Sequence, residues 1–167
     1  MVPRFDFTFK DPGYRKRDVG LPKRYPRKML LKRKRDIGLL KKAIKNTEFE
    51  LKDFITNSSL ALYFNVYNET ETFCYIYRGW DDPGFRIGAV LVLNKNHRLF
   101  KENFRDIFKI CSHNMVSIAV NKEDKVNCMN ISLEIGIYDG GLNRKVLKKA
   151  LQTLWESIKS IRPLLSR

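Results

Sequence analysis

The positive charge of this chain is concentrated in its first quarter, and that asymmetry limits which part can fold compactly. Residues 1–45 hold 16 of the 33 Lys and Arg residues and four of the 18 acidic residues, a formal charge of +12. The other 122 residues hold 17 basic and 14 acidic residues, which leaves +3 of the total of +15. Because like charges oppose compact folding, we expect a basic arm over residues 1–35 and one folded domain over residues 36–167.

The arm is interrupted by residues that disfavour regular structure, so we expect it to be extended. Four prolines and two glycines fall between positions 3 and 26. The cations in and after this stretch are grouped in spaced clusters, and they are the candidates for binding an anionic surface: Arg15, Lys16, Arg17, Lys23, Arg24, Arg27, Lys28, Lys32, Arg33, Lys34 and Arg35. The apolar island Met29-Leu30-Leu31 between these clusters is the candidate for self-association with a second copy.

Spaced basic clusters are typical of three kinds of contact, and the sequence does not separate them. Cations that neutralise nucleic-acid phosphates release counterions and give salt-sensitive binding. The same clusters suit an anionic membrane surface or a nuclear import signal. No base-reading motif accompanies them, so we expect binding to nucleic acid or nucleoprotein to be independent of base sequence.

The pattern of apolar residues after the arm predicts an α+β domain with an antiparallel sheet and helices on one face. It indicates helices over residues 36–45, 100–111 and 142–161, and strands over 60–66, 73–77, 87–93, 115–120 and 126–138. Residues 49–55 are a candidate edge strand. Asp36 is the candidate cap of the first helix, and Pro163 is expected to end the last one.

Two helices have apolar stripes that predict which side faces the core. In the second helix the stripe comprises Phe100, Phe104, Ile107, Phe108 and Cys111. In the last helix it comprises Leu147, Ala150, Leu151, Leu154, Ile158 and Ile161. Trp155 lies beside this second stripe, and we expect it in the core.

No residue pattern here predicts an enzyme, a cofactor, a metal site or a small-molecule substrate. Cys111 and His113 are two residues apart, but no second ligand pair accompanies them, so a core cysteine and a histidine at a helix end are expected instead. Asp81 and Asp82 lie in a Pro-Gly turn, where adjacent acids are usually solvated. Trp80 could stack on a base, although a tryptophan at the rim of the core is the simpler expectation.

The three cysteines and the lack of a long apolar segment indicate reduced thiols and no membrane span. The odd cysteine count, without an apolar leader at the N-terminus, favours the cytoplasm or nucleus. No window reaches the ~20 consecutive apolar residues of a transmembrane helix. A mitochondrial presequence is disfavoured because residues 1–45 contain four aspartates and no serine.

Two segments carry a resemblance to a known family. The segment VLNKNHRLF, ending at Phe100, leads from a strand through a basic turn into an amphipathic helix, and the segment ISLEIGIYD ends at Asp139. Both are similar to segments in the core of rhabdovirus matrix proteins, including the small plant-infecting members. The Pro-Pro-x-Tyr motif of many members is absent, and a long C-terminal helix stands where better-known members continue with a strand.

This resemblance implies a structural assembly protein, located in the virion and the host cytoplasm or nucleus. Its arm would bind nucleocapsid or the inner membrane leaflet, and the protein would form homo-oligomers. The alternative is an RNA-binding subunit of the ribosome or another ribonucleoprotein, whose basic arm threads into RNA. The order of helices and strands also resembles secretion-chaperone-like folds that bind peptides, and an enzyme of unrecognised type stays open.

Overall fold

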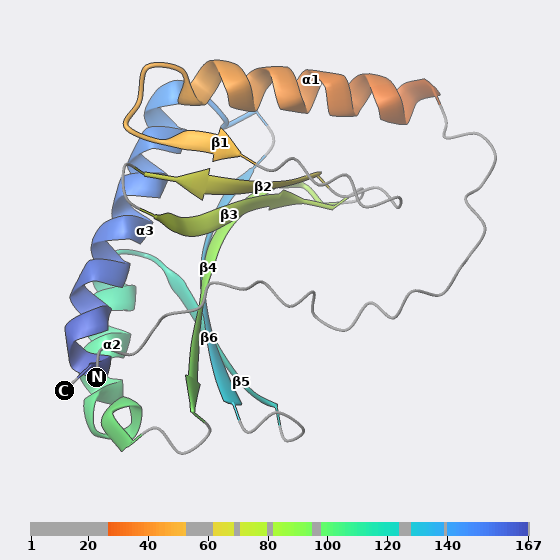
Figure 1. Cartoon of the computed structure of the whole chain (residues 1–167). Coiled ribbons are helices and arrows are strands. Elements are labelled where there is room, and N and C mark those ends of the chain that lie inside the picture. The colour runs from red at the N-terminus through yellow and green to blue at the C-terminus, as the bar shows by residue number, and fades with distance from the viewer. Residues whose placement is uncertain are drawn as a thin grey trace.

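The computed structural model describes residues 27–52, 62–68, 71–79, 82–94, 98–123, 128–138 and 140–166. Over these residues the element order is α1 (Arg27–Ile44), β1 (Glu50–Lys52), β2 (Leu62–Tyr67), β3 (Thr72–Arg78), β4 (Gly84–Asn94), α2 (Arg98–His113), β5 (Ser117–Glu123), β6 (Cys128–Tyr138) and α3 (Arg144–Leu165). The strands form one antiparallel sheet in the order β1-β2-β3-β4-β6-β5 (Figure 1). The α+β prediction is confirmed, and the candidate edge strand is β1.

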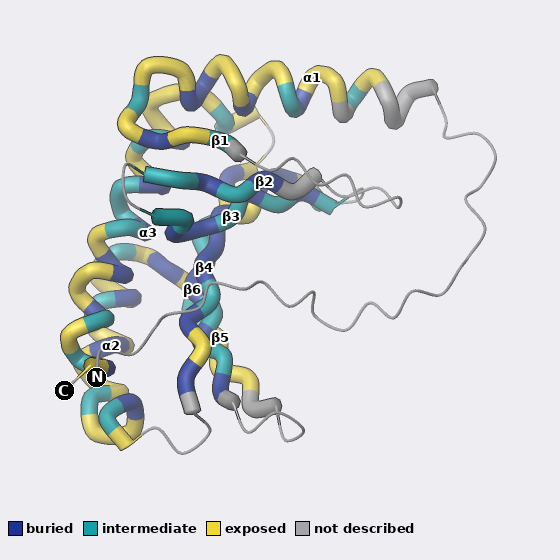
Figure 2. Tube along the Cα trace, viewed as in Figure 1, coloured by how far each residue is buried: buried dark blue, intermediate teal, exposed yellow. Residues whose placement is uncertain are grey.

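The sheet has one face that packs against helices, and the register of its central pair shows why. In β4 and β6, Ala89 lies opposite Leu133 and Leu91 lies opposite Ile131, and all four side chains are buried. Side chains alternate between the two faces of a strand, so these apolar residues share one side. The long helices α2 and α3 lie along that side (Figure 1), and Figure 2 shows that the buried parts of α3 are those turned toward the sheet.

The last helix extends beyond its predicted end. The predicted stripe of α3 is buried throughout, but Pro163 lies inside the helix instead of ending it. A proline near a helix C-terminus removes only one backbone hydrogen bond, and two contacts hold the final turn in place. Leu165 is buried in the core, and Asn103 Nδ2 of α2 donates a hydrogen bond to the Leu164 carbonyl oxygen at 3.0 Å.

The first helix begins earlier than predicted, at Arg27 rather than near residue 36. Residues 27–35, expected to be extended, are therefore helical. They consist only of Arg, Lys, Met and Leu, all strong helix formers, and no glycine or proline occurs from Arg27 until Gly38. Asp36 is consequently in the middle of α1 and does not cap it; its side chain is buried and pairs with Arg78 of β3.

The second helix buries only part of its predicted stripe. Phe100, Ile107 and Cys111 are buried, but Phe104 and Phe108 are 45% and 51% exposed. The reason is the position of α2 at one side of the layer, where it packs against α3 and β5. Its buried side faces the sheet and α3. Phe104 and Phe108 lie on the flank of α2, where their rings contact each other and Phe104 also contacts Phe100.

Candidate nucleic-acid interface

The end of α1 and the start of α3 are held together by a small network of polar contacts. Arg144 Nη2 donates a hydrogen bond of 2.9 Å to the carbonyl oxygen of Asn46, 98 positions earlier in the chain. Glu48 accepts a hydrogen bond from Gln152 Nε2 at 2.6 Å and pairs with Lys148 Nζ at 3.4 Å. These contacts bring two basic segments, far apart in sequence, onto one corner of the molecule (Figure 1).

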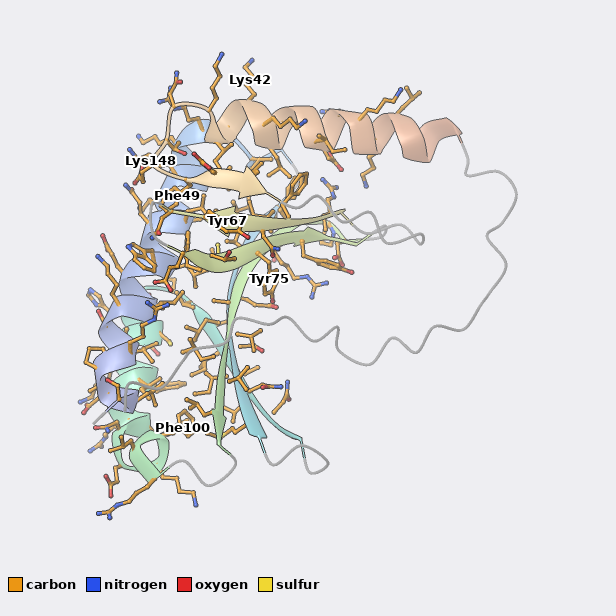
Figure 3. All side chains as sticks on the ribbon, in the orientation of Figure 1. Lys42, Phe49, Tyr67, Tyr75, Phe100 and Lys148 are labelled. Carbon is orange, nitrogen blue, oxygen red and sulfur yellow. The ribbon has the colours of Figure 1, made fainter. Side chains whose placement is uncertain are left out.

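Six exposed cations gather at this corner, and we name them the α1–α3 basic surface: Lys41, Lys42, Lys45, Arg144, Lys145 and Lys149. Across the part of the chain that the structure describes, none of the six forms an ion pair. Figure 3 shows Lys42 pointing outward from α1 and Lys148 on α3 beside the end of that helix. The charges of the six exposed cations are therefore uncompensated by described carboxylates.

The placement of these cations on α3 is unfavourable for the helix itself. The first turn of α3 contains Arg144 and Lys145 and no acidic residue. The N-terminal end of a helix carries a partial positive charge, and a cation there costs roughly 0.3–1 kcal/mol. The helix begins instead with an uncharged cap, since the Asn143 side chain accepts a hydrogen bond from the Val146 amide at 3.0 Å. A bound anion would offset this repulsion.

One carboxylate borders the surface and is kept ionised by its neighbours. The hydrogen bond from its own backbone amide lowers the pKa of Glu48 from its ordinary value. Burial opposes this in part, and the contacts from Gln152 and Lys148 lower the pKa further. Glu48 therefore neutralises Lys148 locally at neutral pH. This explains why Lys148 is excluded from the six residues of the surface.

The predicted binding residues fall into three groups in the structure. Lys34 and Arg35 are exposed on α1, Lys32 is half-buried there, and Leu31 is 58% exposed. Arg27, Lys28, Met29, Leu30 and Arg33 belong to α1, but their side chains lie outside the described part. Arg15, Lys16, Arg17, Lys23 and Arg24 lie outside the described residues altogether. For all of these, binding stays a prediction.

The contribution of α3 to the basic surface is not among the residues predicted from the sequence. Residues 46–167 are nearly balanced in charge, which conceals a cluster of four cations within positions 144–149. A signal was available, because four cations in six residues at a helix start run against the usual preference for acids there. What the sequence could not supply is their position beside α1.

The residues weighed for catalysis have structural surroundings. Cys111 is buried, and this burial raises the pKa of its thiol; His113 is exposed at the end of α2. Asp82 accepts hydrogen bonds from the Gly79 amide at 2.7 Å and from Arg86 at 2.9 Å. Trp80 and Asp81 lie outside the described residues.

The described residues contain no group of three or more His, Cys, Asp or Glu side chains that is placed to hold a metal ion. None of the three described helices is long and apolar enough to cross a membrane.

Comparison with known proteins supports the fold. No protein-family model and no curated protein matches the chain significantly. The crystal structure of an uncharacterized protein from Methanothermobacter thermautotrophicus is similar, with a TM-score of 0.60 over 77% of this chain and 94% of that one. At 12% identity this likeness shows the fold alone. The resemblance to rhabdovirus matrix proteins is not addressed by these comparisons and stays a prediction.

Proposed function

We propose that this chain is a non-enzymatic RNA-binding protein that contacts the phosphate backbone through the α1–α3 basic surface. The observation that carries the proposal is the convergence of six exposed, unpaired cations from two segments about a hundred positions apart. Five of the six are lysines, which contact phosphates as flexible point charges. Such contacts position a nucleic acid without reading its bases.

Burial of the apolar side of α1 favours RNA over a membrane as the partner. A helix that binds a bilayer inserts its apolar face among the lipid chains. In α1 that face contains Leu40, Ala43 and Ile44, all buried in the core. The exposed side of α1 carries mainly charged side chains. Such side chains can contact the phosphates of RNA without inserting an apolar face.

The test is binding of labelled single-stranded RNA by fluorescence anisotropy across a salt series. The variant Lys42→Ala/Lys145→Ala/Lys149→Ala is expected to bind more weakly and to reduce the slope of log affinity against log salt by about 2. The matched control is Lys101→Ala/Arg105→Ala/Lys109→Ala, which removes the same charge from α2. An equal loss in both variants would show that overall charge, and not this surface, binds RNA.

A parallel titration with anionic lipid vesicles decides between the two polyanions. The RNA proposal predicts weak vesicle binding that RNA displaces. Tight vesicle binding by a protein that ignores RNA would overturn the proposal in favour of a membrane surface. Binding to both would favour the matrix-like function over the ribonucleoprotein subunit.

Self-association is a second element of the proposed function, and exposed aromatic residues support it. The rings of Phe104 and Phe108 stack on the outer flank of α2 with centroids 6.3 Å apart. Leu31 is also exposed, within the apolar island predicted for self-association. Adjacent exposed aromatic side chains are typical of surfaces that contact another protein.

A further inference from the structure

We propose that Trp155 is a stacking site for a base of single-stranded RNA that lies along the α1–α3 basic surface, an inference that rests on the proposed function. Trp155 is half-buried on α3, seven positions after Lys148 and four before Lys159. Residues at these spacings lie on the same side of a helix. A stripe of two lysines and an indole thus continues from the basic surface for about 16 Å along α3.

The indole of Trp155 is held rigidly from behind. The ring of Phe73 in β3 packs against it edge-on, with centroids 5.2 Å apart and an interplanar angle of 63°. Phe73 in turn contacts the buried Phe49, with centroids 5.4 Å apart. Because the core already holds the indole in place, its side chain loses little conformational freedom when a base binds to it.

Two cations lie over the indole, and they differ in how firmly they are held. The Arg162 guanidinium is 5.5 Å from the ring centroid, and two hydrogen bonds of 2.6 and 3.0 Å tie it to the Glu71 carboxylate. The Lys159 ammonium is 5.7 Å from the centroid. It is exposed and forms no ion pair with any described residue.

This difference suggests how a base reaches the ring. A phosphate that binds the Lys159 ammonium would draw it away from the indole, because a full negative charge attracts an ammonium more strongly than a ring face does. The base next to that phosphate could then take its place on the ring. Arg162 would stay, since Glu71 holds it. The exposed Glu156 beside Trp155 would face solvent and repel phosphates on its own flank.

Stacking requires an unpaired base, so the inference predicts a preference for single strands. Every base has a flat face, which makes such contacts tolerant of sequence. A base inside a duplex is already stacked on its neighbours and would not reach the ring. Duplex RNA is therefore expected to bind by charge alone.

The experiment uses the full chain with Trp80→Phe, which leaves Trp155 as the sole tryptophan. Titration with poly(U) or poly(A) strands is expected to quench the Trp155 emission, whereas an RNA duplex of matched length leaves it nearly unchanged. In this background Trp155→Leu is expected to weaken single-strand binding by about fivefold or more, with the salt slope unchanged. Trp155→Phe keeps an aromatic ring and should restore most of the affinity.

The controls separate this inference from the proposed function. Lys159→Ala should lower the salt slope by about 0.7, the value for one phosphate contact on a single strand, and preserve quenching. Single-strand binding without quenching, and with full affinity in Trp155→Leu, would overturn the stacking site while the proposed function stands. Absence of RNA binding by the unmodified chain would overturn both. The quenching measurement needs no change at Trp155, so it holds even if Trp155→Leu fails to fold.

Discussion

Asp36 Oδ1 and Arg78 Nη1 lie 3.3 Å apart in the interior, where 8% and 3% of the two side chains are exposed, and their ion pair joins α1 to β3. The Arg78 guanidinium also lies over the ring of Phe85, 4.9 Å from its centroid. A buried charge is costly without a partner of opposite sign. The pair therefore anchors the helix that carries half of the α1–α3 basic surface.

Replacing only one member of this pair should destabilise the fold strongly. Asp36→Leu leaves the Arg78 guanidinium buried without that carboxylate, so we expect the free energy of unfolding to fall by about 3–5 kcal/mol. The measurement is urea denaturation followed by circular dichroism. The double variant Asp36→Leu/Arg78→Met should recover much of the loss, and two independent, additive effects would argue against the pair as an anchor.

Two glycines should respond in opposite directions to alanine. Gly38 is in the middle of α1, and a Cβ there would meet no atom within 4 Å; Gly38→Ala should stabilise the protein by about 0.5–1 kcal/mol. Gly84 begins β4, and a Cβ there would lie 2.0 Å from the carbonyl oxygen of Ile137. Gly84→Ala should therefore destabilise by at least about 1–3 kcal/mol. Thermal unfolding of the two variants and the unmodified protein shows whether each substitution raises or lowers the stability.

Local sequence patterns were sufficient to predict which segments of the domain form helices and which form strands. The alternation of Ile131, Leu133, Ile135 and Ile137 predicts one shared face of β6, because a strand has a period of two. Three of the four are buried, and Ile135 is partly buried against the core. The stripe of α3 was predicted because a helix places every third and fourth residue on one side. Both patterns arise from contacts with a single core, so tertiary packing reinforced them.

Where the structure differs from the sequence-based predictions, the main cause is packing between elements, which a local pattern does not contain. Residues 27–35 favour a helix by composition, but their charge, and the prolines and glycines that precede them, suggested an extended arm. Phe104 and Phe108 follow the helical period, but their exposure depends on the position of α2 in the layer. The position of the start of α3 beside the end of α1 likewise depends on how the two helices pack.

Self-association should depend on the exposed aromatic flank of α2. Phe104→Ser/Phe108→Ser is expected to reduce the apparent mass measured by sedimentation velocity at high protein concentration, because it removes apolar area that a second copy would cover. The monomer should remain folded, since about half of each ring is already in solvent. A parallel variant, Met29→Ser/Leu30→Ser/Leu31→Ser, tests the apolar island. If neither variant changes the mass distribution, self-association uses another surface.

Acid should weaken the fold partly through Asp82. Partial burial raises the pKa of Asp82, but hydrogen bonds from the Gly79 amide and Arg86 outweigh it and hold the pKa below its ordinary value of 3.8. A carboxylate with a lowered folded pKa stabilises the protein above its unfolded pKa, and this contribution is lost as the pH falls through the folded value. The free energy of unfolding should thus decrease below about pH 4. Asp82→Asn should make that decrease shallower, whereas Glu156→Gln, at an exposed site on α3, should not.

Removing the carboxylate of Glu48 should strengthen RNA binding. Glu48 pairs with Lys148 at the border of the α1–α3 basic surface, so Glu48→Gln removes one negative charge and frees one cation for phosphate. An exposed charge contact of this kind is worth about 0.2–1 kcal/mol, so affinity should rise up to about fivefold, and the salt slope should increase by about 0.7. Stability should change little, because glutamine can still accept the hydrogen bond from Gln152. Asp106→Asn on α2 makes the same charge change away from the surface. If it raised the affinity as much as Glu48→Gln does, RNA would be responding to net charge and not to this corner of the fold.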